Sequence, residues 1–314
     1  MLTTDPCLRI EGLLKDFGPV SAHDGKMVRV LNGVDFTANR GAVTALLGAN
    51  GAGKTTTLEC AQGLQRPDGG VVQLLGMRPY NGGPSLRSRV GIMLQDGGLP
   101  PGAKPMPLLR HIAKMYRSPR RVDELADRLG ITSFADIGIR RLSGGQKQRL
   151  ALATALVGNP EVLFLDEPSA GLDPQSRQVV FDLIVEERAK GLGIILTTHL
   201  MEDAQRLADY VYIIDAGKTV AQGTVSELTS GTTEGTPRDL IFEAPQGLTF
   251  EVPSELTLTE NTPGRYTVTG ITTTAQLTLL TSAWESADVL PHSISMVPRS
   301  LEDVFLDLSG RTVS

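Results

Sequence analysis

Apolar positions in the first two thirds of the chain follow two patterns. Short, nearly continuous apolar runs predict strands buried on both faces of a sheet, and they occupy residues 42–47, 90–94, 161–165, 193–197 and 211–214. Longer stretches with helical spacing occupy residues 55–64, 146–157, 175–189 and 201–208. Strands that alternate with helices of this length predict an α/β domain built on a sheet.

Four other regions of the chain show different patterns. Residues 8–13 and 30–36 predict short strands separated by glycines. A proline-rich entry precedes helices at residues 108–116 and 122–129, which predicts a helical insertion over about 96–158 within a domain of residues 1–228. Residues 229–238 are polar and predict a linker. Short strands at 240–243 and 266–269, with helices at 274–286 and 301–308, predict a small α+β domain over residues 239–314.

Composition and charge exclude some function classes. The net charge of -5 argues against nucleic acid as a partner, since such proteins usually present a basic face. The two cysteines, Cys7 and Cys60, lack metal-site spacing and predict reduced thiols. No apolar run approaches the roughly 18–20 residues that cross a bilayer, and the first residues lack the pattern of a signal peptide. If the protein acts at a membrane, we expect it to dock onto another protein there.

A glycine-rich loop follows the run at residues 42–47 and precedes a helix. Its sequence, Gly-Ala-Asn-Gly-Ala-Gly-Lys-Thr, fits the phosphate-binding loop. Glycines let backbone N–H groups close around phosphate oxygens, and the helix N-terminus adds partial positive charge. Lys54 would reach the β- and γ-phosphates, and Thr55 would ligate Mg²⁺. The residues that we expect to contact nucleotide here are Gly48, Asn50, Gly51, Gly53, Lys54, Thr55 and Thr56.

The apolar run at residues 161–165 ends in two acids, Asp166 and Glu167. A buried strand places its terminal carboxylates at the sheet edge where the phosphate-binding loop also lies. Asp166 is predicted to hold Mg²⁺, and Glu167 is predicted to orient and polarise the attacking water.

A second glycine pair opens another helix. In Leu-Ser-Gly-Gly-Gln, Ser143 is placed as an N-cap, and Gly144 and Gly145 leave backbone amides bare beside Gln146. This is a second anion-binding surface, and one γ-phosphate does not need two such surfaces from one chain. Two chains arranged head to tail would supply one each.

These motifs, in this order, resemble the nucleotide-binding domain of ABC ATPases over residues 8 to about 225. The resemblance implies a P-loop fold of ABC type, with a mixed sheet core, an antiparallel N-terminal β subdomain and a helical insertion. It implies further roles for four residues: Gln95 contacts Mg²⁺ and senses a membrane subunit, Asp173 lies in the loop crossing the dimer interface, His199 contacts the γ-phosphate, and Phe17 stacks on adenine. Residues 19–29 are predicted to form an extra loop, which makes this region longer than is usual in the family.

The resemblance implies an ATPase that uses ATP and Mg²⁺, forms an ATP-sandwich homodimer and energises a separate membrane permease. We expect the permease to dock on Gln95 and residues 96–116, holding the protein at the cytoplasmic face of the membrane. Residues 300–308 resemble the closing segment of daunorubicin-resistance-type drug, lipid or polysaccharide exporters, which favours export.

Three alternatives remain at this point. A non-transport ABC ATPase of DNA maintenance or translation would share the motifs, but the inserted coiled coils, zinc modules or second ATPase domain typical of those proteins do not occur in this sequence. A module that binds nucleotide without turnover is disfavoured by Asp166, Glu167 and His199. A small-molecule kinase would not explain the second glycine pair.

Overall fold

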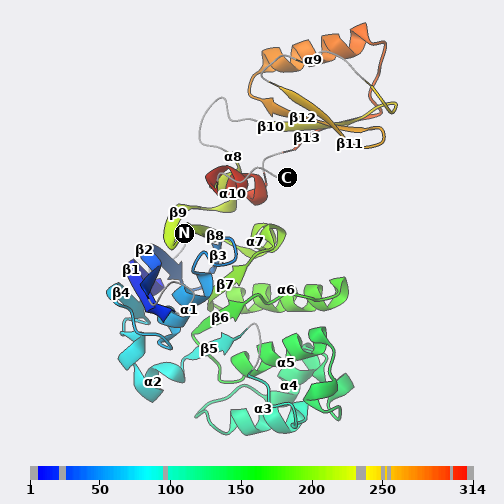
Figure 1. Ribbon diagram of the computed structural model, residues 1–314. Coiled ribbons are helices and arrows are strands. Elements are labelled where there is room, and N and C mark those ends of the chain that lie inside the picture. Colours follow the sequence, from blue (N-terminus) through cyan, green and yellow to red (C-terminus); the bar gives the residue numbers. More distant parts are fainter. Residues whose placement is uncertain are drawn as a thin grey trace. The chain divides into compact units, whose positions relative to one another are not determined.

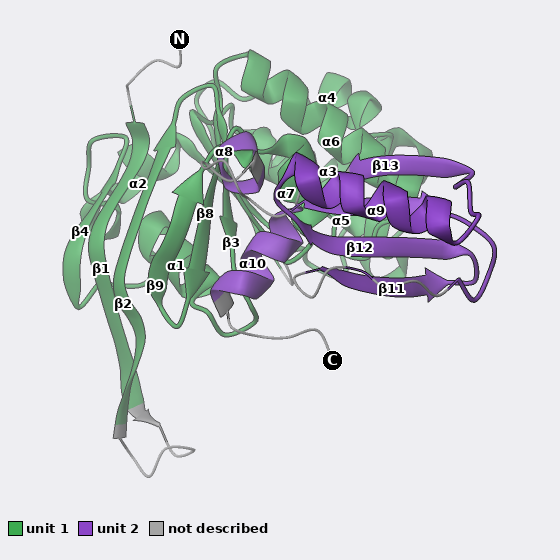
Figure 2. Ribbon diagram, turned by 90° about the horizontal axis from the view of Figure 1, so that it is seen from above, with its two compact units in different colours: residues 1–225 green, residues 226–314 purple. Residues whose placement is uncertain are grey.

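The computed structural model describes residues 6–20, 26–94, 98–230, 238–248, 252, 256–297 and 300–309. The chain forms two compact units, Met1–Val225 and Ser226–Ser314 (Figure 2). Of the predicted linker at residues 229–238, residues 231–237 lie outside the described part. The residues on either side belong to the helix α8 (Val225–Ser230) and to the strand β10 (Arg238–Glu243).

The first unit is built on a six-stranded sheet in the order β5-β6-β7-β3-β8-β9 (Figure 1). The pairs from β5 through β8 are parallel, and β9 is antiparallel to β8. Every residue of β3, β6 and β7 is buried, as their apolar runs predict for strands covered on both faces. The strands are β3 (Val43–Leu47), β5 (Val90–Met93), β6 (Val162–Asp166), β7 (Gly193–Thr198), β8 (Tyr210–Asp215) and β9 (Lys218–Gly223).

A second sheet of three antiparallel strands lies beside the first, in the order β2-β1-β4. Its strands are β1 (Pro6–Val20), β2 (Lys26–Asn39) and β4 (Gly69–Leu74). The helix α1 (Lys54–Gln62) packs in the core between the two sheets, where Leu58 belongs to one buried cluster with Ile10 of β1 and Phe164 of β6. The ABC-type fold with its antiparallel N-terminal subdomain is therefore confirmed.

Helices cover the other face of the large sheet. They are α5 (Gly144–Leu156), α6 (Pro174–Ala189) and α7 (Met201–Leu207) (Figure 1). The inserted region adds α3 (Pro105–Ala113), α4 (Val122–Arg128) and short 3₁₀ turns at Ile131–Phe134 and Ile139–Arg141, while α2 (Gly83–Arg87) and the turn at Pro79–Asn81 precede β5. The helix predicted at residues 108–116 begins three residues earlier, because Pro105 fits the first turn of a helix.

The second unit has its own four-stranded antiparallel sheet and core. The sheet has the order β11-β12-β10-β13, with β11 (Thr257–Thr262), β12 (Arg265–Ile271) and β13 (Ser293–Val297). Phe242, Tyr266 and Trp284 of α9 (Thr274–Ser286) form the aromatic centre of its core. The unit ends with α10 (Leu301–Ser309). None of the described helices in either unit is long and apolar enough to cross a bilayer.

The reading of residues 19–29 as a loop is wrong at both ends. Strand β1 continues through Val20, β2 begins at Lys26, and these two residues pair with each other. Phe17 pairs with Val28 in the same ladder, so the extra residues lengthen a β-hairpin. The tip at residues 21–25 lies outside the described part.

Candidate functional site

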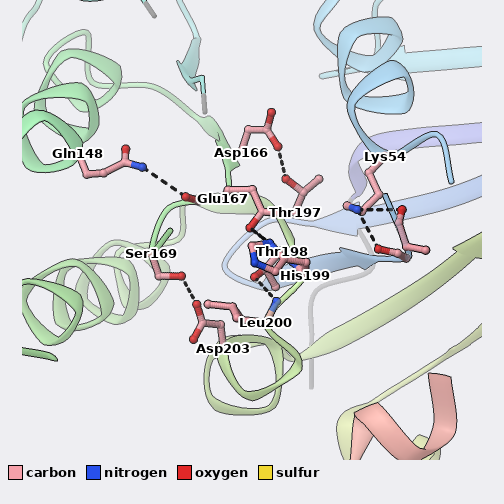
Figure 3. Close-up of polar contacts among 12 residues, drawn as sticks. Lys54, Gln148, Asp166, Glu167, Ser169, Thr197, Thr198, His199, Leu200 and Asp203 are labelled. Carbon is pink, nitrogen blue, oxygen red and sulfur yellow. Dashed lines mark hydrogen bonds and ion pairs between the residues drawn. The ribbon is translucent and has the colours of Figure 1, made fainter. Parts of the chain in front are cut away.

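The carboxyl ends of three neighbouring strands meet at one edge of the large sheet. The glycine loop follows β3, Asp166 ends β6, and His199 follows β7. Figure 3 shows Lys54, Asp166, Glu167 and His199 gathered there. They share a cavity of about 270 Å³ whose other lining residues are Val30, Asn50, Gly51, Gly53, Thr55 and Thr56.

The glycine loop needs residues without side chains for two separate reasons. Gly51 and Gly53 have φ angles of 83° and 105°, which L side chains rarely adopt. At Gly48 a Cβ would lie 2.4 Å from the Ile214 carbonyl oxygen, and at Gly53 it would lie 2.5 Å from Leu31 Cδ2. Helix α1 begins after Gly53 with no side chain capping it. Its first N–H groups can therefore bind an anion.

Lys54 is folded back over this loop. Its Nζ donates to the carbonyl oxygen of Gly48 at 2.8 Å and to that of Ala49 at 3.2 Å. The residue is 8% exposed, and burial lowers the pKa of its ammonium group, while the nearby charges of Glu167 and Asp166 act in the opposite direction. Among the described residues, Lys54 forms no salt bridge within 4 Å. An arriving phosphate could replace the two carbonyl contacts without breaking an ion pair.

The two acids at the end of β6 have different surroundings. Asp166 accepts a hydrogen bond from Thr197 Oγ1 on β7, and Glu167 Oε2 lies 2.8 Å from His199 Nδ1 (Figure 3). Glu167 has a left-handed backbone with φ of 51°, which is unfavourable for a residue with a Cβ. Its N–H donates to the Thr197 carbonyl oxygen at 3.1 Å. The carboxylate is thereby turned toward His199 and the cavity.

The donor set fits Mg²⁺. The Thr55 hydroxyl and the Asp166 carboxylate line the same cavity, and hard oxygen ligands of this kind suit the ion. Among the described residues, no cluster of three or more His, Cys, Asp or Glu could hold a metal by itself. Mg²⁺ characteristically completes its coordination with substrate phosphates and water, so this partial protein set is sufficient.

The second glycine pair opens α5 as predicted. Ser143 Oγ accepts from Gln146 N at 3.2 Å, and Gln146 Oε1 accepts from Ser143 N at 3.0 Å, which makes a full capping box. These residues do not line the 270 Å³ cavity. Gly144 instead borders a second cavity of about 460 Å³ together with Gly171 and Gln148.

Asp173 caps the neighbouring helix α6. It accepts from Ser176 N at 2.9 Å, and this backbone hydrogen bond lowers the pKa of Asp173. A Cβ on Gly145 would lie 3.0 Å from Ser176 Oγ, so the starts of α5 and α6 are in close contact.

Two predicted residues lie apart from the cavity or outside the described part. Gln95 falls among residues 95–97, which the structure does not describe. Phe17 is half-buried on β1, with Lys15 Nζ 5.3 Å from the centre of its ring, and it does not line the cavity. Val30 does line the cavity, and it follows Val28, the partner of Phe17, by two residues along β2.

Sequence reasoning missed several residues that contact this site. Val30 borders the cavity, Thr197 donates to Asp166, and Gln148 Nε2 donates to the Glu167 carbonyl oxygen at 3.5 Å. The two threonines before His199 were the available signal for Thr197, because hydroxyls at a strand end can reach a neighbouring strand's end. Asp203, whose carboxylate accepts from the Ser169 hydroxyl, was also missed.

Comparisons with known proteins agree with this geometry. The model of the ABC transporter family matches residues 31–170. The daunorubicin resistance ATP-binding protein DrrA3 of Streptomyces coeruleorubidus is 32% identical over 314 residues, which cover 98% of this chain and 96% of that protein. The Nod factor export ATP-binding protein I of Ralstonia nicotianae is 38% identical over 228 residues, which cover 71% of this chain and 68% of that protein.

Solved structures match the first unit in shape. The structure of CbiO1 from Clostridium perfringens, part of the ABC transporter complex CbiONQ, aligns with a TM-score of 0.63 at 32% identity. The alignment covers 72% of this chain and 92% of that one.

Proposed function

Because the chain belongs to the ATP-binding proteins of ABC transporters, we propose that it hydrolyses Mg²⁺-ATP at the cavity beside Lys54 to drive export through a separate permease. Members of this family couple ATP hydrolysis to transport. One observation carries the assignment of the site. Lys54, Thr55, Asp166, Glu167 and His199 come from three strand ends and line one cavity.

Phosphate binding is the first task of the site. The bare N–H groups of the glycine loop and of the start of α1 would surround the β-phosphate, and Lys54 would exchange its two carbonyl contacts for phosphate oxygens. Thr55 and Asp166 would hold Mg²⁺, which supplies charge neutralisation on the phosphate oxygens. Thr197 fixes the Asp166 carboxylate for that role.

Water attack is the second task. Glu167 would accept a hydrogen bond from the attacking water and orient it in line with the γ-phosphate. His199 already lies 2.8 Å from the Glu167 carboxylate, so it would hold that group and meet the γ-phosphate from the same side. Positioning and charge stabilisation account for most of the catalysis in such a site.

A second copy of the chain would complete the site. ABC ATPase subunits dimerise and pair with a membrane permease. In a head-to-tail homodimer, Ser143 and Gly145 of one copy would face Lys54 and Thr55 of the other. The capping box supports this proposal, because it holds the start of α5 rigid while leaving the amides of the glycine pair open.

Export is the proposed direction, since relatives at 32% and 38% identity are named for daunorubicin resistance and Nod factor export. The permease would dock on the described part of the segment after Gln95, residues 98–116. Leu94 and Met115 are 43% and 68% exposed. Leu94, Leu99 and Pro101 form part of the apolar lining of the 460 Å³ cavity, which Arg140 and Lys147 also line, and apolar side chains of this kind can receive a short helix from a partner. Docking there would hold the protein at the cytoplasmic face of the membrane.

Turnover by the purified full chain tests the proposed chemistry. We expect ATP hydrolysis that requires Mg²⁺ and is abolished in Lys54→Ala. Thr57→Ser, which keeps the hydroxyl that donates to Gly53, is the control for disturbance of α1. A Lys54→Ala protein that hydrolyses ATP at the wild-type rate would refute the site.

Recovery of a polytopic membrane protein from membranes tests the partner. Wild-type chain should recover it, and charged substitutions at Leu99 and Met106 should not, provided that circular dichroism shows both variants folded. Recovery of nucleic acid or ribosomes in its place would contradict the transport function.

A further inference from the structure

A buried carboxylate links the segment after Glu167 to the helix after His199. Asp203 is 2% exposed and Ser169 is 3% exposed. The Ser169 hydroxyl donates to Asp203 Oδ2, and the Arg177 guanidinium donates to Asp203 Oδ1, so each carboxylate oxygen has a partner (Figure 3 draws the first contact). An ionised carboxylate is retained at such a site only when it is paired and hydrogen-bonded in this way.

The two partners of Asp203 flank one exposed loop. Ser169 lies two residues after Glu167, and Arg177 lies in the first turn of α6. Between them, Gly171 and Asp173 are exposed. Asp203 therefore bonds to a residue on each side of the loop 170–173, Ser169 before it and Arg177 after it. Within the loop, Asp173 caps the start of α6.

Glu167 depends on contacts of this kind. Its left-handed backbone is unfavourable and persists only where the surroundings hold it. Its N–H donates to the Thr197 carbonyl oxygen, and its carbonyl oxygen accepts from Ala170 N at 3.2 Å and from Gln148 Nε2 at 3.5 Å. The hydrogen bond from Ser169 to Asp203 anchors the segment between Glu167 and Ala170 to α7.

The result is a double connection between the ends of β6 and β7. Glu167 contacts His199 at the cavity, and Ser169, two residues after Glu167, contacts Asp203, four residues after His199. Both contacts connect the segment after β6 to the segment after β7.

We infer that Asp203, through Ser169 and Arg177, is a positioning residue that sets the orientation of the Glu167 carboxylate for ATP hydrolysis. This inference rests on the proposed catalytic role of Glu167. Asp203 does not line the nucleotide cavity, so its loss should leave ATP affinity intact and reduce the rate of the chemical step.

The chain offers a matched control. Glu202 is the preceding residue, carries the same charge and also faces Arg177, at 3.7 Å, but its side chain is 86% exposed. Asp203→Asn and Glu202→Gln therefore remove the same charge from neighbouring positions, one buried and one in solvent. Ser169→Ala removes the other side of the buried contact and serves as an independent variant if Asp203→Asn folds poorly.

The test measures kcat, KM for ATP and ATP-binding stoichiometry of the full chain, with rates expressed per titrated binding site. Asp203→Asn and Ser169→Ala should each lower kcat roughly 10- to 100-fold, the scale of a small misplacement in a catalytic site, with KM within about twofold. Glu202→Gln should match wild type. The double variant Ser169→Ala/Asp203→Asn should be no slower than Asp203→Asn, because Ser169 acts through its contact with Asp203.

Wild-type kcat per site in both single variants would overturn the inference, as would single effects that multiply in the double variant. A wild-type chain that binds ATP but does not hydrolyse it would instead overturn the proposed function and remove the ground for this inference.

Discussion

Charged side chains at the two edges of the six-stranded sheet differ in their partners. At the amino-terminal edge, charged residues precede the parallel strands and neutralise one another. Glu161, before β6, accepts from Arg40 at 2.9 Å and from Arg89 at 2.9 Å. Glu187, 1% exposed, lies near Lys190, before β7, and accepts from it at 2.8 Å and from Arg120 at 2.6 Å.

At the carboxyl-terminal edge, charged side chains are paired less completely with opposite charges of the chain. Lys54 rests on carbonyl oxygens although Asp166 and Glu167 line the same cavity, and Glu167 faces His199 from a strained backbone. The two edges of one sheet therefore differ in how far their charged groups are paired with opposite charges of the chain. The charges at the amino-terminal edge have opposite partners within the chain, whereas Lys54 at the other edge donates only to carbonyl oxygens among the described residues.

The largest effect is expected from removing the charge of Glu167. Glu167→Gln should bind ATP but lose turnover by roughly 10²–10⁴-fold, the usual value of a general base. It should also accumulate the ATP-bound homodimer, which light scattering with and without ATP would detect. The added variant Ser143→Arg should prevent that dimer by placing bulk and charge at the start of α5. A Glu167→Gln protein that remains monomeric at saturating ATP would count against the composite site.

Removing a charge from the amino-terminal edge should lower the stability of the fold and leave the rate of ATP hydrolysis unchanged. Burial tends to raise the pKa of Glu187, but hydrogen bonds from Arg120 and Lys190 leave it lowered. Glu187→Gln should reduce the free energy of unfolding by about 2 kcal/mol, because Arg120 then loses its charged partner. Circular dichroism during denaturation would measure this.

The same experiment contains two controls. Glu186→Gln removes the neighbouring acid, whose side chain is 44% exposed and pairs with Arg128, and should cost less than about 1 kcal/mol. The single tryptophan, Trp284, lies in the core of the second unit. Its fluorescence transition should not move in Glu187→Gln. Equal losses for Glu186→Gln and Glu187→Gln would contradict the structural reading of the buried pair.

A smaller effect is expected at Phe17, on the hairpin that leads away from the cavity. Phe17→Ala should weaken ATP binding by about 1 kcal/mol, or roughly fivefold, if its ring stacks on adenine. Titration with a fluorescent ATP analogue would measure the change. Unchanged affinity combined with lower thermal stability would show that Phe17 only packs against Val28 and Lys15.

The smallest expected effect is pH-dependent stability at Glu161. Hydrogen bonds from Arg89 lower the pKa of Glu161 to about 2, against burial, and Arg40 adds to the shift. Because the folded pKa lies below the unfolded one, the stabilisation is present above pH ~4.5 and is lost as pH falls toward ~2. Glu161→Gln should therefore be less stable than wild type near neutral pH by under about 1 kcal/mol, since the carboxylate is 38% exposed. A difference that does not shrink with acid would be inconsistent with this origin.

Much of the first unit could be predicted from the sequence, because buried strands and phosphate loops have strong local patterns. Strands β3, β6 and β7 are nearly continuous apolar runs. In the second unit, α9 was predicted at its observed bounds, Thr274–Ser286. Strands β4, β9, β11 and β13 were missed. Each is short and lies at or near a sheet edge, and β11 is almost wholly exposed, so its residues lack an apolar repeat.

In the candidate site, too, local patterns could be predicted and contacts between distant residues could not. The structure brings predicted motif residues such as Lys54 and Asp166 to one cavity, because loop and strand geometry are local. The contact of Ser169 with Asp203 joins residues that are 34 positions apart, and it exists only because α7 packs beside the end of β6. No periodicity or spacing in the sequence encodes such a contact. The left-handed backbone of Glu167 is also invisible in its residue type, since glutamate rarely adopts it.

The most direct test of the contrast between the edges is to measure ATP turnover per binding site and the free energy of unfolding on Glu167→Gln and Glu187→Gln together. The contrast predicts that Glu167→Gln keeps its unfolding free energy within about 1 kcal/mol of wild type while turnover falls at least about 100-fold. It predicts that Glu187→Gln loses stability and hydrolyses ATP at the wild-type rate per folded molecule. Wild-type turnover in Glu167→Gln would contradict the assignment of the catalytic edge.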